Sequence, residues 1–140
     1  MNSKNFIKLW LPVILWAGVI YFFSSLQTNN LDAPFSLSDF IIKKNAHVFE
    51  FALLAVLFFR ALYQSFKNKV FIKNAWLTFG FGILYAISDE FHQRFIFGRT
   101  SRLRDVVIDG VGILLALLFL KILMKYKDKY KRIYHFIFGK

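Results

Sequence analysis

With 140 residues, 57% of them hydrophobic and 20% aromatic, the chain is long enough for one domain and more apolar than a soluble domain, which is usually about 45–50% apolar. The net charge of +11 does not indicate nucleic-acid binding, because the basic residues lie between and beside the apolar runs and no recognition motif accompanies them. The lack of cysteine excludes disulfides and thiolate metal sites.

Four apolar segments predict four transmembrane helices. They cover about residues 9–26, 44–63, 75–88 and 106–124, and the first of them carries no charge. An uncharged run of this length can cross a bilayer as a helix. The third segment is short for a span, so its helix is expected to continue through the polar residues up to Gln93. The expected fold is an all-α integral membrane protein, a bundle of four transmembrane helices with a basic amphipathic C-terminal tail.

Two polar stretches lie outside these segments. Residues 27–40 contain several turn-forming residues and no apolar periodicity, which predicts a loop outside the bilayer. Residues 125–140 form a lysine-rich cytoplasmic tail, separate from the membrane domain of residues 1–124. Aromatic residues recur every four positions along the tail, at Tyr126, Tyr130, Tyr134 and Phe138. This spacing predicts one aromatic helix face with lysines on the others, a surface that fits anionic lipid better than a specific protein partner.

The lysines and arginines predict which side of the membrane each end occupies. With both termini in the cytoplasm, thirteen of these residues lie on the cytoplasmic side and six on the outer side. The positive-inside rule therefore favours a multi-pass plasma-membrane protein with cytoplasmic N- and C-termini. In this orientation the unusual polar residues in and beside the spans gather at the outer face of the membrane.

These polar residues form the predicted site. They are Lys44, His47, Glu50, Asp89, Glu90, His92, Gln93, Arg99, Arg104, Asp105 and Asp109. His47 and Glu50 share a helix face, and ionisable groups inside a span are rare without a role. One interpretation is a network of ion pairs that locks three helices together. The other is a pocket in which arginines bind an anionic headgroup while carboxylates and histidine transfer protons or bind a divalent metal, although no metal-binding motif is present.

Four motifs carry a resemblance to a known family. They are Phe23-Ser24-Ser25 followed by Gln27; Lys44-x-x-His47-x-x-Glu50; Ser88-Asp89-Glu90-x-His92-Gln93-x-Phe95; and Gly98-Arg99-x-x-x-x-Arg104-Asp105-x-x-x-Asp109-x-x-Gly112. On these motifs the stretch from Tyr21 to Leu120 resembles the VanZ-like family of small multi-pass membrane proteins. In the first motif Leu26 separates Ser25 from Gln27, where the family commonly has the three residues adjacent. The resemblance implies a role in the Gram-positive cell envelope and a link to resistance to the glycopeptide teicoplanin, and it implies no particular reaction.

Two functions remain as alternatives. The first is a non-catalytic envelope protein whose outer pocket binds the headgroup of an envelope lipid or precursor. The second is a membrane-embedded enzyme for a phosphorylated or lipid-linked substrate, with Glu90 or Asp109 as base or metal ligand and His47 as acid. Arg99 and Arg104 would hold the anion. The further substrate-binding candidates are Lys44, Glu50, Asp89, His92, Gln93 and Asp105. A transporter is disfavoured because the polar groups lie at one face of the membrane, and the small surface buried between four short helices leaves room for a homo-oligomer.

Overall fold

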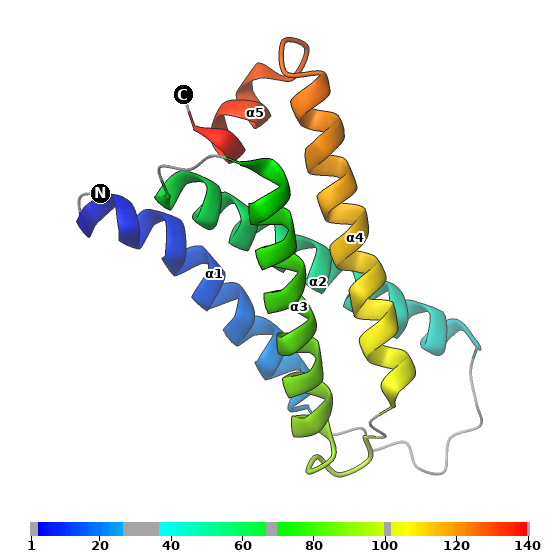
Figure 1. Cartoon of the computed structure of the whole chain (residues 1–140). Helices are drawn as coiled ribbons and strands as arrows, with labels where there is room; N and C mark the ends of the chain where they lie inside the picture. Colours follow the sequence, from blue (N-terminus) through cyan, green and yellow to red (C-terminus); the bar gives the residue numbers. More distant parts are fainter. Residues whose placement is uncertain (1–2, 27–36, 67–69, 100–101, 140) are drawn as a thin grey trace.

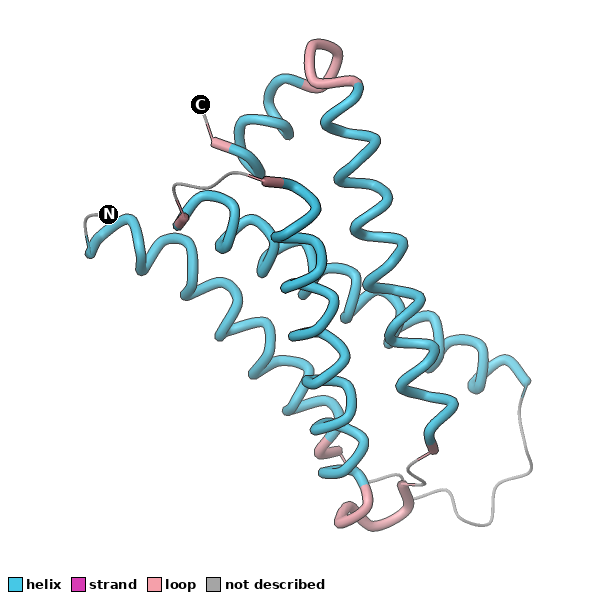
Figure 2. Tube along the Cα trace, viewed as in Figure 1, coloured by secondary structure: helices cyan, strands magenta, loops and turns pink. Residues whose placement is uncertain are grey.

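Every regular element in the described part of the chain is a helix. The computed structural model describes residues 3–26, 37–66, 70–99 and 102–139, and Figure 2 shows their helical course. The helices are α1 (Ser3–Ser24), α2 (Leu37–Ser65), α3 (Phe71–Gln93), α4 (Leu103–Lys125) and α5 (Lys131–Phe138). The prediction of an all-helical chain is confirmed over these ranges.

The four long helices run alternately up and down. Both chain termini and α5 lie at one end of the molecule, and the α3–α4 connection lies at the other (Figure 1). Helix α2 crosses the others obliquely and contacts each of them, most extensively α4. The polar ends of α1 and α3 and the beginning of α4 therefore meet at the end opposite the termini.

In the part of the chain that the structure describes, three helices are long and apolar enough to cross a membrane. These spans are Asn5–Ser24, Lys44–Ser65 and Leu103–Lys125, in α1, α2 and α4. Helix α3 has 23 residues and reaches Gln93 as predicted, but it carries Lys73 near its start and several polar residues in its last turns. Those groups lower its mean hydropathy, so the fourth span of the predicted bundle stays a prediction.

The second helix begins earlier than the apolar pattern indicated. Helix α2 starts at Leu37, inside the segment of residues 27–40 that was expected to be a loop. All the turn formers on which that expectation rested except Ser38 precede Leu37, and no proline or glycine interrupts the sequence from there to Lys44. The helix therefore continues through the last residues of the expected loop, and residues 27–36 lie outside the described residues.

Small residues let α4 approach its neighbours closely. A Cβ atom on Gly112 would overlap the backbone carbonyl of Val48 in α2, and one on Gly82 would lie 2.5 Å from the Cδ1 atom of Ile113. Close backbone approach at glycine is typical of packed membrane helices. It explains why α2 and α4 can bring polar side chains within contact distance at their neighbouring ends.

The apolar side chains divide between two buried clusters and a large exposed surface. One cluster joins α1, α2, α3 and α4, and the other joins α2, α3, α4 and α5 at the end that holds the termini. Exposed large side chains on α4 include Val107, Val111, Leu114, Leu115, Leu118, Phe119 and Ile122. Apolar helix faces of this extent require lipid, and the chain is accordingly a membrane protein.

The prediction of one continuous aromatic face along the tail is wrong. Residues 126–130 form turns between α4 and α5, so the first two tyrosines of the row lie outside α5. Helix α5 folds back onto the end of α2, where Phe138 is 2% exposed and stacks edge-on against Phe59 and Tyr63. Burying these rings is favourable, and that burial requires a turn after Lys125.

Candidate functional site

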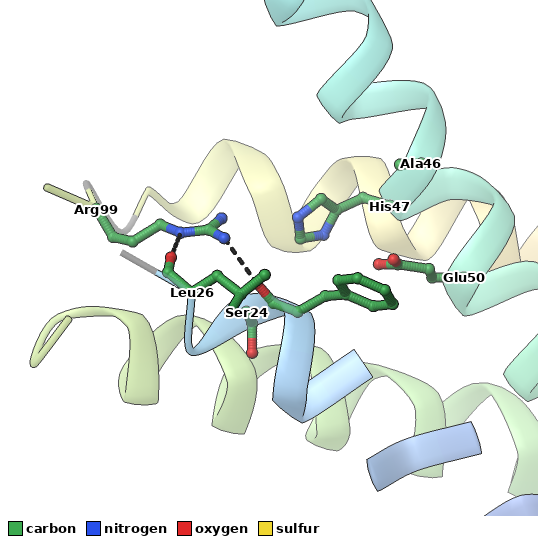
Figure 3. Close-up of a pocket in the computed structure, with 7 residues that line it drawn as sticks. Ser24, Leu26, Ala46, His47, Glu50 and Arg99 are labelled. Carbon is green, nitrogen blue, oxygen red and sulfur yellow. Dashed lines mark hydrogen bonds between the residues drawn. The ribbon is translucent and has the colours of Figure 1, made fainter. Parts of the chain in front are cut away.

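A pocket of about 400 Å³ opens at the end of the bundle opposite the termini. Its lining comes from the end of α1, the third and fourth turns of α2 and the α3–α4 connection: Phe23, Ser24, Leu26, Ala46, His47, Glu50 and Arg99. Figure 3 shows Arg99 at one end, Glu50 at the other and His47 between them. Three of the predicted site residues therefore line one cavity, together with apolar side chains that the prediction did not include.

Arg99 holds the end of α1 in place. Its Nε atom donates to the carbonyl oxygen of Leu26 at 3.1 Å, and Nη2 donates to that of Phe23 at 2.8 Å (Figure 3). The last carbonyls of a helix have no partner within the helix, and a cation there also interacts favourably with the helix dipole. Arg99 therefore donates two N–H groups to backbone carbonyls at the end of α1, and its side chain also lines the pocket.

His47 faces a buried carboxylate on α4. Its Nδ1 atom lies 3.3 Å from Oδ1 of Asp109, whose side chain is 1% exposed. No well-formed hydrogen bond from the described residues reaches either oxygen of Asp109, so the nearby imidazole is its main compensation. With Nδ1 directed at Asp109, Nε2 is the ring nitrogen left for a ligand.

Glu50 is positioned by its backbone and not by its side chain. The indole N–H of Trp16 in α1 donates to the carbonyl oxygen of Glu50 at 2.9 Å, which fixes this turn of α2 against α1. Glu50 is half-buried, and its carboxylate has no ion pair or hydrogen bond with any side chain among the residues described. The pocket thus contains a carboxylate that forms no side-chain hydrogen bond or ion pair in that part of the chain, while His47 and Arg99 act on it electrostatically.

A second layer of polar residues joins α1 to α3 behind the pocket. The Ser24 hydroxyl donates to Oδ1 of Asp89 at 2.6 Å, and Gln93 Nε2 donates to Oδ2 at 2.7 Å. Ser25 donates to the carbonyl oxygen of Tyr21 at 2.6 Å, so its single proton is used and His92 Nε2, 3.0 Å away, acts as donor. Asp89 and Gln93 are buried, and this layer fixes the helix ends that form the pocket wall.

The remaining predicted residues lie outside the pocket lining. Glu90 Oε2 accepts a 2.9 Å hydrogen bond from the backbone N–H of Arg102, just before α4. Lys44 forms a 2.6 Å ion pair with Asp105, and Nε of Arg104 lies 3.7 Å from the same oxygen. These contacts join α2, α3 and the start of α4. Roles in catalysis or substrate binding for these residues stay predictions.

Metal ligands do not gather in the described residues. No group of three histidine, aspartate or glutamate side chains in residues 3–26, 37–66, 70–99 and 102–139 is placed to hold one ion. Within these ranges His47 and Asp109 make a pair without a third such ligand.

Comparison with known proteins gives the family. The sequence profile described as VanZ/LLP1 matches residues 9–124. The chain belongs to the VanZ/LLP1 family. No curated protein and no solved structure gives a significant match. The resemblance found in the sequence motifs is thereby confirmed, and the VanZ/LLP1 match extends from Leu9 in α1 through α2 and α3 to Met124 in α4.

The pocket also contains residues that the sequence reasoning did not select. Phe23 was noted only as part of a motif, and Leu26 and Ala46 received no role. Ala46 is four positions before Glu50, so helical spacing alone would have placed it on the same face. No local signal marks Leu26 or Trp16, because their contacts are made with other helices.

Proposed function

We propose that this VanZ/LLP1 protein binds the polar headgroup of an envelope lipid or lipid-linked precursor. The observation that supports this most directly is the pocket itself, with His47, Glu50 and Arg99 inside and the side chains of Phe23 and Leu26, 50% and 45% exposed, beside them. Sites for small ligands combine an apolar lining with a few polar groups that fix orientation. A lipid likewise combines a polar headgroup with apolar acyl chains.

The outer face of the plasma membrane is the proposed location of the pocket. Both termini lie at the opposite end of the bundle, and the excess of lysine and arginine favours a cytoplasmic position for them. The pocket would then meet wall precursors and glycopeptides outside the cell. Occupation of a precursor headgroup would change access of a teicoplanin-type antibiotic to its target, in keeping with the Gram-positive setting that the resemblance implies.

Antibiotic susceptibility tests this proposal. A susceptible Gram-positive host would express the wild type, Arg99→Gln or Asp128→Asn, and the inhibitory concentration of teicoplanin would be measured at matched membrane levels. Asp128 is exposed at the far end of the molecule and serves as a charge-change control. We expect the wild type and Asp128→Asn to raise the inhibitory concentration and Arg99→Gln to have no effect. Equal protection by all three would remove the pocket from the explanation.

A second candidate is a membrane-embedded enzyme for a phosphorylated or lipid-linked substrate. It is favoured by the 3.3 Å approach of His47 to the buried Asp109, because an imidazole oriented by a carboxylate can accept or donate a proton at its other nitrogen. Arg99 would hold the anionic group of the substrate. Glu90 would contribute only if it left the backbone of Arg102.

Mass spectrometry separates the two candidates. Membrane lipids and wall precursors would be compared in cells that express the wild type, Asp109→Asn or no protein. Turnover predicts a species that rises or falls with the wild type alone. Identical profiles, with the variant inserted normally, would leave binding as the proposed function.

The basic tail is proposed to contact anionic lipid at the cytoplasmic surface. The lysines at positions 127, 129 and 131 are exposed, and Nζ of Lys129 lies 5.5 Å from the ring centroid of Tyr130, which is 44% exposed. Basic residues next to exposed aromatic side chains are typical of segments that lie on anionic membranes. This contact would hold the protein at the cytoplasmic surface without involving the pocket.

A further inference from the structure

We infer that the headgroup bound in the pocket is zwitterionic, with an ammonium group at Glu50 and a phosphate at Arg99. The inference rests on the proposed binding function and adds the chemical class of the ligand. It follows from the order of charged groups along the cavity, where Arg99 and Glu50 lie at opposite ends and His47 lies between them (Figure 3). A purely anionic headgroup would satisfy only one end.

A cation would complete the Glu50 end of the pocket. The Glu50 carboxylate lines the cavity and forms no ion pair with a side chain of the described residues. His47 acts on Glu50 electrostatically, but its Nδ1 atom lies 3.3 Å from Asp109, so the ion pair that His47 forms is with Asp109 and not with Glu50. Trp16 holds the backbone of Glu50, so the carboxylate stays beside the cavity. An ionised carboxylate removed from bulk water is stabilised by a charged donor, which a ligand amine would provide.

The Arg99 end requires an anion. Its hydrogen bonds to the carbonyl oxygens of Phe23 and Leu26 use two N–H groups on Nε and Nη2. A guanidinium has five such donors, so three are not used in these two hydrogen bonds, and these three can donate to phosphate oxygens. The same two bonds hold the side chain in position before any ligand arrives. His47 Nε2, between the two ends, would contact a phosphate oxygen or the link between phosphate and amine.

The cavity has the size for a headgroup and not for a whole lipid. Its volume of about 400 Å³ lies near the low end of small-molecule sites, which span about 300–1,000 Å³. Phe23 and Leu26 are half exposed beside it, so acyl chains attached to a bound headgroup would meet apolar side chains and surrounding lipid. A lipid with a phosphoethanolamine headgroup would place its phosphate at Arg99, its amine at Glu50 and its acyl chains beside Phe23 and Leu26.

Native mass spectrometry of the full-length protein in detergent micelles tests the inference. The probes are phosphatidylethanolamine and phosphatidylglycerol with the same acyl chains, which share the phosphate and differ in the amine. We expect the wild type to bind phosphatidylethanolamine about tenfold more tightly, as one charge-assisted hydrogen bond would give. Glu50→Gln should abolish this preference, Glu50→Asp should retain it, and Arg99→Gln should weaken binding of both lipids. Asp128→Asn, which removes an acid at the far end, should leave both affinities unchanged.

The outcomes distinguish the inference from the function on which it rests. Equal affinity of the wild type for the two lipids, both weakened by Arg99→Gln, would overturn the zwitterionic ligand and retain headgroup binding. Binding that neither Glu50→Gln nor Arg99→Gln alters, in variants whose circular dichroism matches the wild type, would overturn both. Soluble glycerophosphoethanolamine should compete with the lipid while glycerophosphoglycerol should not, and failure of that competition would assign recognition to the acyl chains instead.

Discussion

Asp89 and Gln93, both in α3, form a buried hydrogen bond, and Asp89 also accepts a hydrogen bond from Ser24 in α1. Gln93 Nε2 donates to Asp89 at 2.7 Å, and Ser24 donates to the other carboxylate oxygen. Gln93→Glu would replace the amide N–H donor with a carboxylate oxygen, an acceptor, in a side chain of nearly the same shape. We expect it to lower the free energy of unfolding by about 1–3 kcal/mol, the usual cost of an unsatisfied buried polar group. Unfolding in mixed micelles measures the change.

Two matched variants check this explanation. Ser88→Glu adds the same charge to an exposed position of α3 and should have almost no effect. Asp89→Asn should also be mild, because the Ser24 hydroxyl can accept from the new amide and donate to the Tyr21 carbonyl oxygen 3.1 Å away. A large loss with Ser88→Glu would show that added charge, and not the missing donor, destabilises the protein.

Gly112 determines how closely α2 and α4 approach. Since a Cβ atom there would overlap the carbonyl oxygen of Val48, Gly112→Ala must move one backbone. Overpacking of this kind typically costs about 1–3 kcal/mol. The same substitution at Gly80 meets no atom within 4 Å and is the matched control. Thermal unfolding in detergent should show a lower midpoint for Gly112→Ala only, and equal midpoints would contradict the assigned packing.

At the scale of the elements, α5 is held on α2 by backbone contacts. Arg60 Nε donates to the carbonyl oxygen of Phe136 at 2.9 Å, and Gln64 Nε2 donates to those of Phe136 and Ile137 at 2.8 Å each. The Arg60 guanidinium also lies 4.3 Å from the centroid of the Phe136 ring. These contacts satisfy carbonyl groups in the last turn of a short helix, which has little stability alone.

Loss of these donors should release α5. We expect the double change Arg60→Met and Gln64→Leu to raise trypsin cleavage after Lys131 and Arg132 about fivefold or more, since each exposed bond contributes on the order of 0.5–1.5 kcal/mol. Lys73→Met, which removes an exposed cation from α3, is the control and should leave the rate unchanged. Unchanged cleavage in the double variant would show that the buried Ile137 and Phe138 side chains suffice to dock α5.

At the scale of the whole molecule, the number of membrane crossings depends on α3. If α3 crosses, the termini lie on one side and the α3–α4 connection on the other, as the bundle arrangement in Figure 1 requires. The chain contains no cysteine, so single cysteines can be introduced without background. We expect an impermeant maleimide to label Arg94→Cys on intact cells and to label Lys8→Cys and Lys127→Cys only after lysis. Labelling of Lys127→Cys on intact cells would contradict the proposed orientation.

The sequence by itself determined the helical membrane class, the family and the end of the bundle where polar groups gather. These are readable because they depend on local properties: apolar run length, residue spacing along a helix and short motifs such as Lys44-x-x-His47-x-x-Glu50. The beginning of α2 at Leu37 was missed because turn formers before it dominated the local pattern.

Only the tertiary structure decided which contacts each polar residue makes. The sequence predicts Glu90 as a base or metal ligand and pairs Arg104 with Arg99 as an anion clamp. In the structure Glu90 accepts from the backbone just before α4 and Arg104 lies beside Asp105, whereas Glu50 and Arg99 line the pocket. The position of Phe138 was also decided by the tertiary structure. The turn after Lys125 separates Tyr126 and Tyr130 from the two aromatic residues in α5, because burying Phe138 against α2 stabilises the fold more than a continuous helix would. Spacing along a chain determines which residues share a face, whereas crossing geometry determines what that face meets.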